Sequence, residues 1–177
     1  VEFENILKTT WLKIIKAEEN DTNGGSLQVW VTKKSNNNFE NKKNKENILK
    51  IKIKEFDKKL DELETYSLFA NRVKNHKLKL VKILNKLKKE KKRIHIYGMS
   101  TKLNTILNYC EISSDLIQFA AERSPEKWDA TTISGIKMIS EEESRKNVDI
   151  YLIGPYHFKK EILEREQESI KKGIKFL

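Results

Sequence analysis

The stretch from Ile94 to Cys110 constrains the fold of this chain more than any other. Alternating β-branched and aromatic residues stop at Gly98, small hydroxyl residues follow, and apolar residues then recur at helical spacing. This order predicts a strand, a tight turn and the start of a helix. The free N–H groups and the positive dipole end of such a helix favour phosphate, and Lys102 adds a positive charge. Many α/β proteins with the same junction bind nothing, so a purely structural interpretation stays open.

A second strand is predicted over residues 116–122, which form a mainly apolar run. If the two strands are parallel, the connection is a right-handed βαβ crossover. Glu122 then follows Gly98 at about the spacing at which dinucleotide-binding folds place a carboxylate on a ribose hydroxyl. A nicotinamide-dependent enzyme is therefore an alternative. Against it, the turn has Gly98 but not the further glycines of that motif, and Leu103 would crowd the helix against the strand.

The remaining C-terminal sequence continues this alternation. Ser140 is expected to cap a short helix that begins with three glutamates. A strand is then expected over residues 148–153, a helix over residues 158–168 and a last strand over residues 174–177. Strands alternating with helices predict an α/β fold with a Rossmann-like parallel sheet and flanking helices. Ligands of such sheets bind at the carboxyl ends of strands, where the chain has Gly98, Glu122 and Tyr156–His157.

The N-terminal half predicts a different organisation. A helix over residues 1–10 precedes a β-hairpin of strands 11–17 and 27–32, whose paired glycines allow the positive φ that a turn requires. Residues 35–47 are polar and are expected to form a mobile linker. One long helix, or two in series, is expected over residues 51–90. A coiled-coil dimer is the alternative for this helical region, although its heptads do not persist.

The charge of the chain raises a nucleic-acid hypothesis. The 177 residues carry a formal net charge of +10. However, the lysines of residues 36–54 alternate with acidic and amide residues, and the dense basic run 86–93 lies at a predicted helix end, where cations are favourable. No aromatic residues interleave with that run, and no standard DNA- or RNA-binding motif is present. Nucleic-acid binding is therefore the less favoured alternative.

Other compositional features exclude several classes of site. The single cysteine, Cys110, excludes an internal disulfide and is expected to be a small buried apolar residue. His76 and His95 fall within helical and strand patterns, and no Cys/His spacing supports a zinc site. No apolar run approaches the roughly 18 to 20 residues of a membrane span, and no signal peptide is recognisable. These features lead us to expect a cytoplasmic protein without a metal or a membrane partner.

Four segments, in order and spacing, resemble the C-terminal domain of the S-adenosylmethionine-dependent sugar C-methyltransferases. The family reads GYGASTKGN followed by LLNYC, HGGSLRV, DRNP and LPWHFKDEI at the corresponding places. This chain has YGMSTKLN at 97–104 with ILNYC at 106–110, NGGSLQV at 23–29, ERSP at 122–125 and GPYHFKKEI at 154–162. Met99 and Leu103 depart from the family's alanine and glycine, and place more side chain beside any ligand of the turn.

The resemblance implies an organisation in three parts. Residues 1–34 would end the S-adenosylmethionine domain, with the Gly-Gly-Ser segment either near the active cleft or simply a turn. Residues 35–91 would form a flexible linker and long helix, and residues 92–177 would form the Rossmann-like substrate domain. The intact enzyme would transfer methyl from S-adenosylmethionine to a sugar carbon beside a keto group. The family's catalytic histidine and S-adenosylmethionine-binding glycines lie upstream, so we expect no catalytic residue here and no activity of this portion alone. Its partners would be a nucleotide-diphosphate sugar and the upstream domain.

The candidate substrate residues follow from the strand ends and the resemblance together. Ser100, Thr101 and Lys102 are expected to receive diphosphate or hydroxyls, and Glu122 a ribose or sugar hydroxyl. Tyr156 is expected to stack on a base or sugar. His157 could serve as a proton acceptor, but the resemblance favours a pocket or surface residue. The full set is Gly98, Ser100, Thr101, Lys102, Asn104, Glu122, Arg123, Tyr156 and His157. A structural or dimerising domain with a vestigial pocket is the main alternative.

Overall fold

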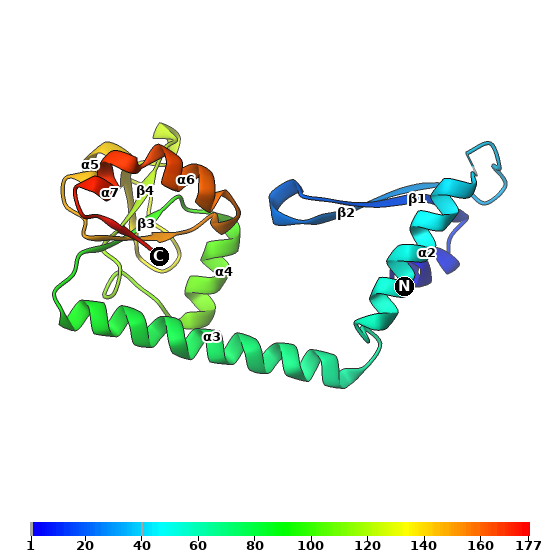
Figure 1. Cartoon of the computed structure of the whole chain (residues 1–177), viewed down its shortest axis with the longest axis horizontal. Helices are drawn as coiled ribbons and strands as arrows, with labels where there is room; N and C mark the ends of the chain where they lie inside the picture. Colours follow the sequence, from blue (N-terminus) through cyan, green and yellow to red (C-terminus); the bar gives the residue numbers. More distant parts are fainter. Residues whose placement is uncertain (1, 40) are drawn as a thin grey trace. The chain divides into compact units, whose positions relative to one another are not determined.

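The computed structural model describes residues 2–39 and 41–177, which form two compact units. The N-terminal unit ends at Asn71, and the C-terminal unit runs from Arg72 to Leu177. Figure 1 shows the first in blue to cyan and the second in green to red. Helix α3 (Leu63–Lys89) begins in one unit and ends in the other. Among the described residues, no helix combines the length and the apolar character that crossing a membrane requires.

The C-terminal unit is built on a five-stranded sheet in which every neighbouring pair is parallel. The strand order β5-β4-β3-β6-β7 places β3 at the centre, with β4 on one side and β6 on the other. This confirms the predicted parallel α/β sheet. The strands are β3 (Ile94–Tyr97), β4 (Phe119–Glu122), β5 (Lys137–Ser140), β6 (Ile150–Ile153) and β7 (Lys175–Phe176).

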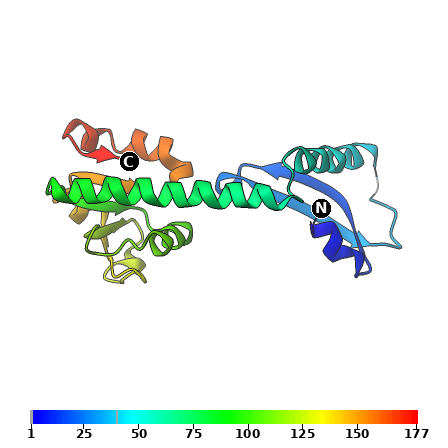
Figure 2. The ribbon, with the colours of Figure 1, turned by 90° about the horizontal axis from the view of Figure 1, so that it is seen from below.

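Helices cover both faces of this sheet (Figures 1 and 2). On one face, Leu84 of α3 and Leu103 and Leu107 of α4 join a core that contains Ile96 of β3. On the other face, Ile162 packs with Tyr97 and Tyr151 in a second core. Burial on both faces explains why the strands read as nearly continuous apolar runs. The helices of this unit besides α3 are α4 (Thr101–Cys110), α5 (Glu141–Arg145), α6 (Lys159–Arg165) and α7 (Gln167–Lys171), with 3₁₀ turns η2 (Pro125–Lys127) and η3 (Tyr156–Phe158).

Two local predictions in this unit have distinct outcomes. Ser140 caps α5 as expected, because its hydroxyl accepts a hydrogen bond from the backbone N–H of Glu143 at 3.1 Å. The single helix expected over residues 158–168 is wrong: it divides into α6 and α7 at Glu166, whose ψ of 22° lies outside the helical range. The side chain of Glu166 is buried and hydrogen-bonded, so tertiary contacts hold this residue at the break.

The N-terminal unit is a two-stranded antiparallel hairpin with helices beside it. Strands β1 (Leu12–Asn20) and β2 (Ser26–Lys33) pair from Leu12↔Lys33 to Asn20↔Ser26, which confirms the predicted hairpin. The turn η1 (Thr22–Gly24) joins them, and both glycines of its Gly-Gly pair have positive φ. Helix α1 (Glu2–Lys8) lies within the helix expected over residues 1–10, of which Val1 lies outside the described residues.

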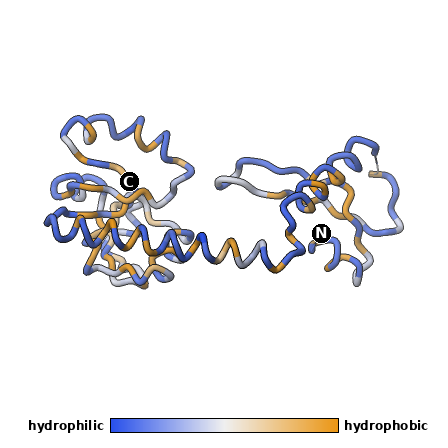
Figure 3. The backbone as a smooth tube through the Cα atoms, turned by 60° about the horizontal axis from the view of Figure 1, so that its bottom comes forward, coloured by the Kyte–Doolittle hydropathy of each residue, from blue (hydrophilic) through white to orange (hydrophobic). Residues whose placement is uncertain are grey.

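The mobile linker expected over residues 35–47 is wrong for its second half. Helix α2 (Lys42–Asp57) begins there, and the side chain of Asn41 caps it by accepting a hydrogen bond from the N–H of Asn44 at 2.8 Å. The first turns of α2 are polar, and its later residues Ile48 and Ile51 line a cavity together with residues of the hairpin. Of the two alternatives predicted for residues 51–90, one long helix or two in series, the structure shows the second, with α2 beginning earlier than predicted. Figure 3 shows hydrophobic and hydrophilic residues alternating along α3, as its amphipathic pattern predicts.

Candidate functional site

The carboxyl ends of β3, β4 and β6 border a cavity of about 350 Å³ in the C-terminal unit. Open parallel sheets bind ligands at this edge, because loops from several strands converge there. The cavity combines charged side chains with a short apolar wall. Its lining residues are Tyr97, Gly98, Glu122, Arg123, Glu141, Pro155, Phe158, Glu161, Ile162 and Arg165.

Gly98 forms the floor where β3 ends. Its φ of +75° is a conformation that residues with a side chain rarely adopt, and a Cβ there would lie 3.1 Å from Cδ of Pro155. The second close approach is at Gly154, where a Cβ would lie 1.9 Å from the carbonyl oxygen of Gly98. Both glycines are therefore required for the β3 and β6 ends to meet.

The carboxylate of Glu122 reaches across to this turn. Its Oε1 accepts a hydrogen bond from the backbone N–H of Met99 at 2.6 Å and lies 3.3 Å from Nζ of Lys127. The Glu122 side chain is buried, and its backbone carbonyl accepts a hydrogen bond from the indole of Trp128. A negative charge of the protein therefore already occupies one of the turn amides that the sequence offered to a phosphate.

A buried network of charged side chains supports the opposite wall. Glu166 accepts hydrogen bonds from the hydroxyl of Tyr97 at 2.7 Å, from Nε of Arg145 at 3.0 Å and from the hydroxyl of Ser169 at 2.6 Å. Arg165 donates to the Tyr97 oxygen and to the carboxylate of Glu141. Sequence reasoning missed this network, because its members come from a strand and from several helices, and no local pattern signals that they share partners.

This network determines the charge of its members. Burial alone would raise the pKa of Glu166, but hydrogen bonds from Arg145, Ser169 and Tyr97 lower that pKa to about 2. Burial and the bond to Glu166 together raise the pKa of Tyr97 well above its usual value. At neutral pH the wall therefore holds an ionised carboxylate and a neutral phenol.

A second buried polar chain lies deeper in the unit. The hydroxyl of Tyr151 donates to Oγ of Ser144 at 2.8 Å, and that oxygen lies 2.7 Å from Nδ1 of His95. Burial lowers the pKa of His95 to about 4 and raises the pKa of Tyr151 to about 12. A neutral His95 accepting from Ser144 would carry its proton on Nε2. None of the three residues lines the strand-end cavity.

The structure brings together only part of the predicted site. Gly98, Glu122 and Arg123 line the cavity. The hydroxyl of Ser100 caps its own helix by accepting from the N–H of Leu103 at 3.2 Å. The side chains of Thr101 and Lys102, at the start of the same helix, are exposed and do not line the cavity. Tyr156 is likewise exposed and outside the lining.

Two further predicted residues carry an unusual feature. Oδ1 of Asn104 and Nδ1 of His157 are buried, and neither atom has a hydrogen-bond partner within the described residues. Buried polar atoms are normally paired, so such atoms point to water or ligand as the missing partner. The ring of His157 packs against Tyr156 and Phe158, with centroid distances of 5.6 and 4.4 Å.

The side chains that depart from the family pattern turn away from the cavity. Met99 and Leu103 are both buried and belong to the core shared with α3. Cδ2 of Leu103 lies 3.0 Å from the position of a Cβ on Gly154. Neither side chain lines the strand-end cavity.

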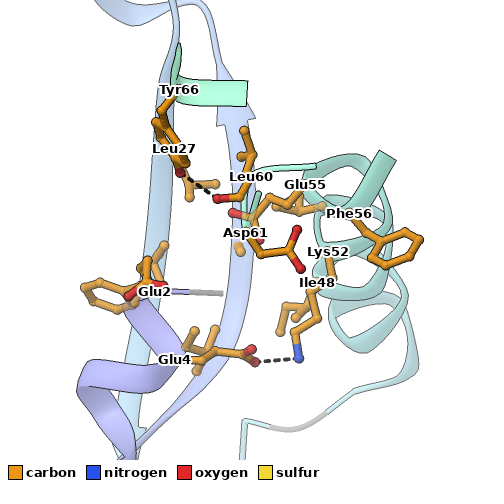
Figure 4. A pocket seen from close by; sticks show the side chains of 15 residues that line it. Glu2, Glu4, Leu27, Ile48, Lys52, Glu55, Phe56, Leu60, Asp61 and Tyr66 are labelled. Atoms are coloured by element: carbon orange, nitrogen blue, oxygen red, sulfur yellow. Dashed lines mark hydrogen bonds and ion pairs between the residues drawn. The ribbon is translucent and has the colours of Figure 1, made fainter. Parts of the chain in front are cut away.

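A second cavity, of about 340 Å³, lies in the N-terminal unit (Figure 4). Residues of α1, the hairpin, α2 and the start of α3 surround it, and its walls are mainly apolar. Lys52 pairs with Glu4 at 2.7 Å, and the hydroxyl of Tyr66 donates to the carbonyl of Leu60 at 2.6 Å. Further carboxylates, Glu2, Glu55 and Asp61, lie at its border.

Comparison with protein families gives a match over residues 21–177 to the C-methyltransferase C-terminal domain. The match spans most of the chain, from the hairpin turn and strand β2 through every strand of the parallel sheet, while strand β1 precedes it. The chain belongs to this family. A search of curated proteins gave no match. The family match confirms the resemblance to a C-methyltransferase C-terminal domain that the sequence motifs indicated, and it supports a methyltransferase context for this chain.

The Gly98 turn of this C-methyltransferase domain is crowded: Cδ of Pro155 lies 3.1 Å from the position of a Cβ on Gly98, and the Glu122 carboxylate accepts a hydrogen bond from the Met99 amide. The turn therefore differs from the open glycine-rich cradle with which dinucleotide-binding folds hold a pyrophosphate. Among the described residues, no group of three or more His, Cys, Asp or Glu side chains is placed to hold a metal ion.

Proposed function

We propose that this C-methyltransferase C-terminal domain binds a nucleotide-diphosphate sugar at the carboxyl ends of β3, β4 and β6. The observation that carries the proposal is the strand-end cavity, in which the buried carboxylate of Glu122 and the guanidinium of Arg123 stand on consecutive residues. A carboxylate accepts hydrogen bonds from sugar or ribose hydroxyls, and a guanidinium pairs with phosphate. A ligand that carries both hydroxyl and phosphate groups matches the wall formed by Glu122 and Arg123.

Three predicted residues that do not line the cavity are proposed to contact the same ligand. The buried, unpaired atoms of Asn104 and His157 offer an acceptor and a ring nitrogen to hydroxyls. Tyr156 is 62% exposed, and its ring is available to stack on a base or sugar. The positive dipole end of α4, with Ser100, Thr101 and Lys102, remains our predicted second anchor for the diphosphate.

We further propose that methyl transfer needs an upstream S-adenosylmethionine domain. The intact enzyme would transfer methyl to a sugar carbon beside a keto group, and this chain would hold the sugar. The apolar residues exposed on the N-terminal unit, including Trp11 (87%), Phe56 (75%) and Leu63 (82%), suit packing against such a domain. No catalytic step is assigned to residues of this chain.

Isothermal titration calorimetry of the full chain tests the proposal. The panel contains uridine-, thymidine-, guanosine- and cytidine-diphosphate sugars, S-adenosylmethionine and a short oligonucleotide. We expect saturable binding of one diphosphate sugar, weakened about tenfold or more by Glu122→Gln because a charged acceptor is lost. Glu126→Gln, an exposed neighbour, is the matched control and should bind normally.

Three outcomes would contradict this function. Binding of S-adenosylmethionine alone would place the methyl donor in this chain. Binding of the oligonucleotide with a steep salt dependence would favour the nucleic-acid alternative. Binding of no ligand by a folded chain would favour a structural or dimerising domain.

A further inference from the structure

We infer that Arg123 and Arg165 form an anion subsite for one phosphate group inside the strand-end cavity, and that the buried Tyr97–Glu166–Arg145 network fixes the position of Arg165. This inference rests on the proposed function, because it assigns a subsite within the same cavity. It moves the main phosphate contact away from the start of α4 to the walls formed by β4 and α6.

Arg123 supplies the first guanidinium. It follows β4 directly, is exposed and lines the cavity. In the part of the chain that the structure describes, its side chain has no hydrogen bond and no ion pair. All five of its N–H groups are therefore free for an anion, and the planar fork suits two oxygens of one phosphate.

Arg165 supplies the second guanidinium in a fixed position. Its Nη2 donates to Oε1 of Glu141 at 2.8 Å and to the hydroxyl of Tyr97, and its Cζ lies 5.4 Å from the Tyr97 ring centroid. Within the described residues its Nη1 has no hydrogen-bond partner. One edge of the guanidinium is thus held by the protein while Nη1 stays available to a ligand.

Within the described residues, Arg123 is the cation of the cavity lining that no carboxylate contacts. Glu122 is paired with Lys127 and the Met99 amide. The carboxylates of Glu141 and Glu166 balance the guanidiniums of Arg145 and Arg165, which they contact. Arg123 and Glu161 are the remaining charged lining residues, so an anion is most favoured close to Arg123 and far from Glu161.

The start of α4 is a weaker anion site by the same reasoning. The Glu122 carboxylate, 2.6 Å from the Met99 nitrogen, places a negative charge beside the turn. A phosphate bound there would be repelled by that charge. Glu122 is instead suited to the hydroxyl groups of the same ligand.

The position of Arg165 depends on groups that do not touch the ligand. The Tyr97 oxygen accepts from Arg165 and donates to Glu166, which Arg145 and Ser169 hold in turn. Tyr97 and Glu166 are positioning residues in this scheme. Preorganisation of this kind raises affinity because the guanidinium loses little freedom when the anion binds.

The test is calorimetric titration of the full chain with inorganic pyrophosphate and with uridine diphosphate. We expect Arg123→Gln and Arg165→Gln each to weaken binding of both probes about tenfold or more, because each removes a charge-assisted hydrogen bond. Arg165→Lys should restore only part of the loss, since lysine lacks the fork. Lys102→Gln should weaken binding less than either arginine variant, because it removes only the second anchor. The exposed Lys172→Gln is the matched control and should change binding less than about threefold.

A double-mutant cycle tests the positioning role. Tyr97→Phe should weaken pyrophosphate binding, and adding it to Arg165→Gln should cause no further loss, because Tyr97 acts through Arg165. Equal losses in both backgrounds would overturn the positioning role. Thermal unfolding of each variant in a Trp11→Phe, Trp30→Phe background, in which fluorescence reports on Trp128, establishes that the C-terminal unit is folded.

The outcomes separate this inference from the proposed function. Loss of binding in Lys102→Gln but not in the arginine variants would overturn the subsite and leave nucleotide-sugar binding intact. Arginine-dependent binding of pyrophosphate without binding of any diphosphate sugar would support the subsite and contradict the proposed function. Failure of both probes to bind the folded wild-type chain would overturn the subsite.

Discussion

The two units of this chain use similar proportions of apolar sequence very differently. In the C-terminal unit, a five-stranded sheet is covered on both faces, and side chains such as Ile96 and Leu107 are fully buried. In the N-terminal unit, a two-stranded hairpin has helices beside it, and among its described residues only Leu7 and Ala17 are buried apolar residues. A hairpin alone presents too little surface to enclose a core.

This difference indicates that the C-terminal unit is stabilised by a core of its own, whereas the N-terminal unit buries few apolar side chains. The C-terminal unit buries enough apolar surface to order the strand ends that border the candidate site. The N-terminal unit instead exposes large apolar side chains, which suits a surface that packs against another domain. Four predictions test this contrast.

The largest effect is expected from a core substitution. Leu107→Ala, at a fully buried position of α4, should lower the free energy of unfolding of the C-terminal unit by about 2–5 kcal/mol, because it leaves a cavity. Leu49→Ala on α2, where the side chain is 57% exposed, should change stability by less than about 0.5 kcal/mol. Urea unfolding followed by Trp128 and Trp30 measures both. A large cost at Leu49 would show that the N-terminal unit has a core of its own.

The buried carboxylate of the C-terminal unit should come next. Glu166→Gln removes the charge that Arg145 and Tyr97 contact, and it should lower the free energy of unfolding by about 3 kcal/mol. Glu168→Gln, whose carboxylate is exposed beside Lys171, should have an effect of less than about 0.5 kcal/mol. Chemical denaturation of both variants at pH 7 compares them. Equal stability would mean that the network contributes nothing to the fold.

Acid should weaken the C-terminal unit through His95. Burial lowers the pKa of His95 from 6.5 to about 4, so between these pH values the unfolded chain binds a proton that the folded chain excludes. Stability is therefore present above pH 6.5 and falls as the pH drops, by about 3 kcal/mol at pH 4. Urea midpoints measured from pH 7 to pH 4.5 give the slope. His95→Gln should flatten that slope; an unchanged slope would assign it to other groups.

The smallest effects are expected from removing one helix N-cap in each unit, because the same kind of hydrogen bond is lost in two different surroundings. Ser100→Ala removes the cap of α4 and Asn41→Ala the cap of α2, each a side chain that accepts one backbone hydrogen bond. We expect a local cost of about 1 kcal/mol at each site. Hydrogen exchange should show the loss across the whole C-terminal unit for Ser100 and only in the first turns of α2 for Asn41. A global effect at Asn41 would contradict the contrast.

Local sequence signals predicted a large part of the fold. Gly98, Ser100 and the apolar spacing that follows predicted the strand, turn and helix, and Ser140 predicted the start of α5. These succeed because turns and caps depend on neighbouring residues alone. The start of α2 was missed, because its first turns are polar and its packing residues come later. The prediction of a single final helix failed at Glu166, where distant partners override helix propensity.

The candidate site divides in the same way. The sequence placed Gly98, Glu122 and Tyr156–His157 at strand ends, since the order of strands and turns is local information. Of these, Gly98 and Glu122 line one cavity, together with Arg123 of the candidate set. The tertiary structure alone decided that Glu122 turns onto the Met99 amide and that Arg165 shares a network with Tyr97 and Glu166. The pairs in these contacts lie 23 and 68 or 69 residues apart in the chain. Sequence by itself determined which groups stand at element ends, whereas only packing of the helices on the sheet determined which of those charges meet.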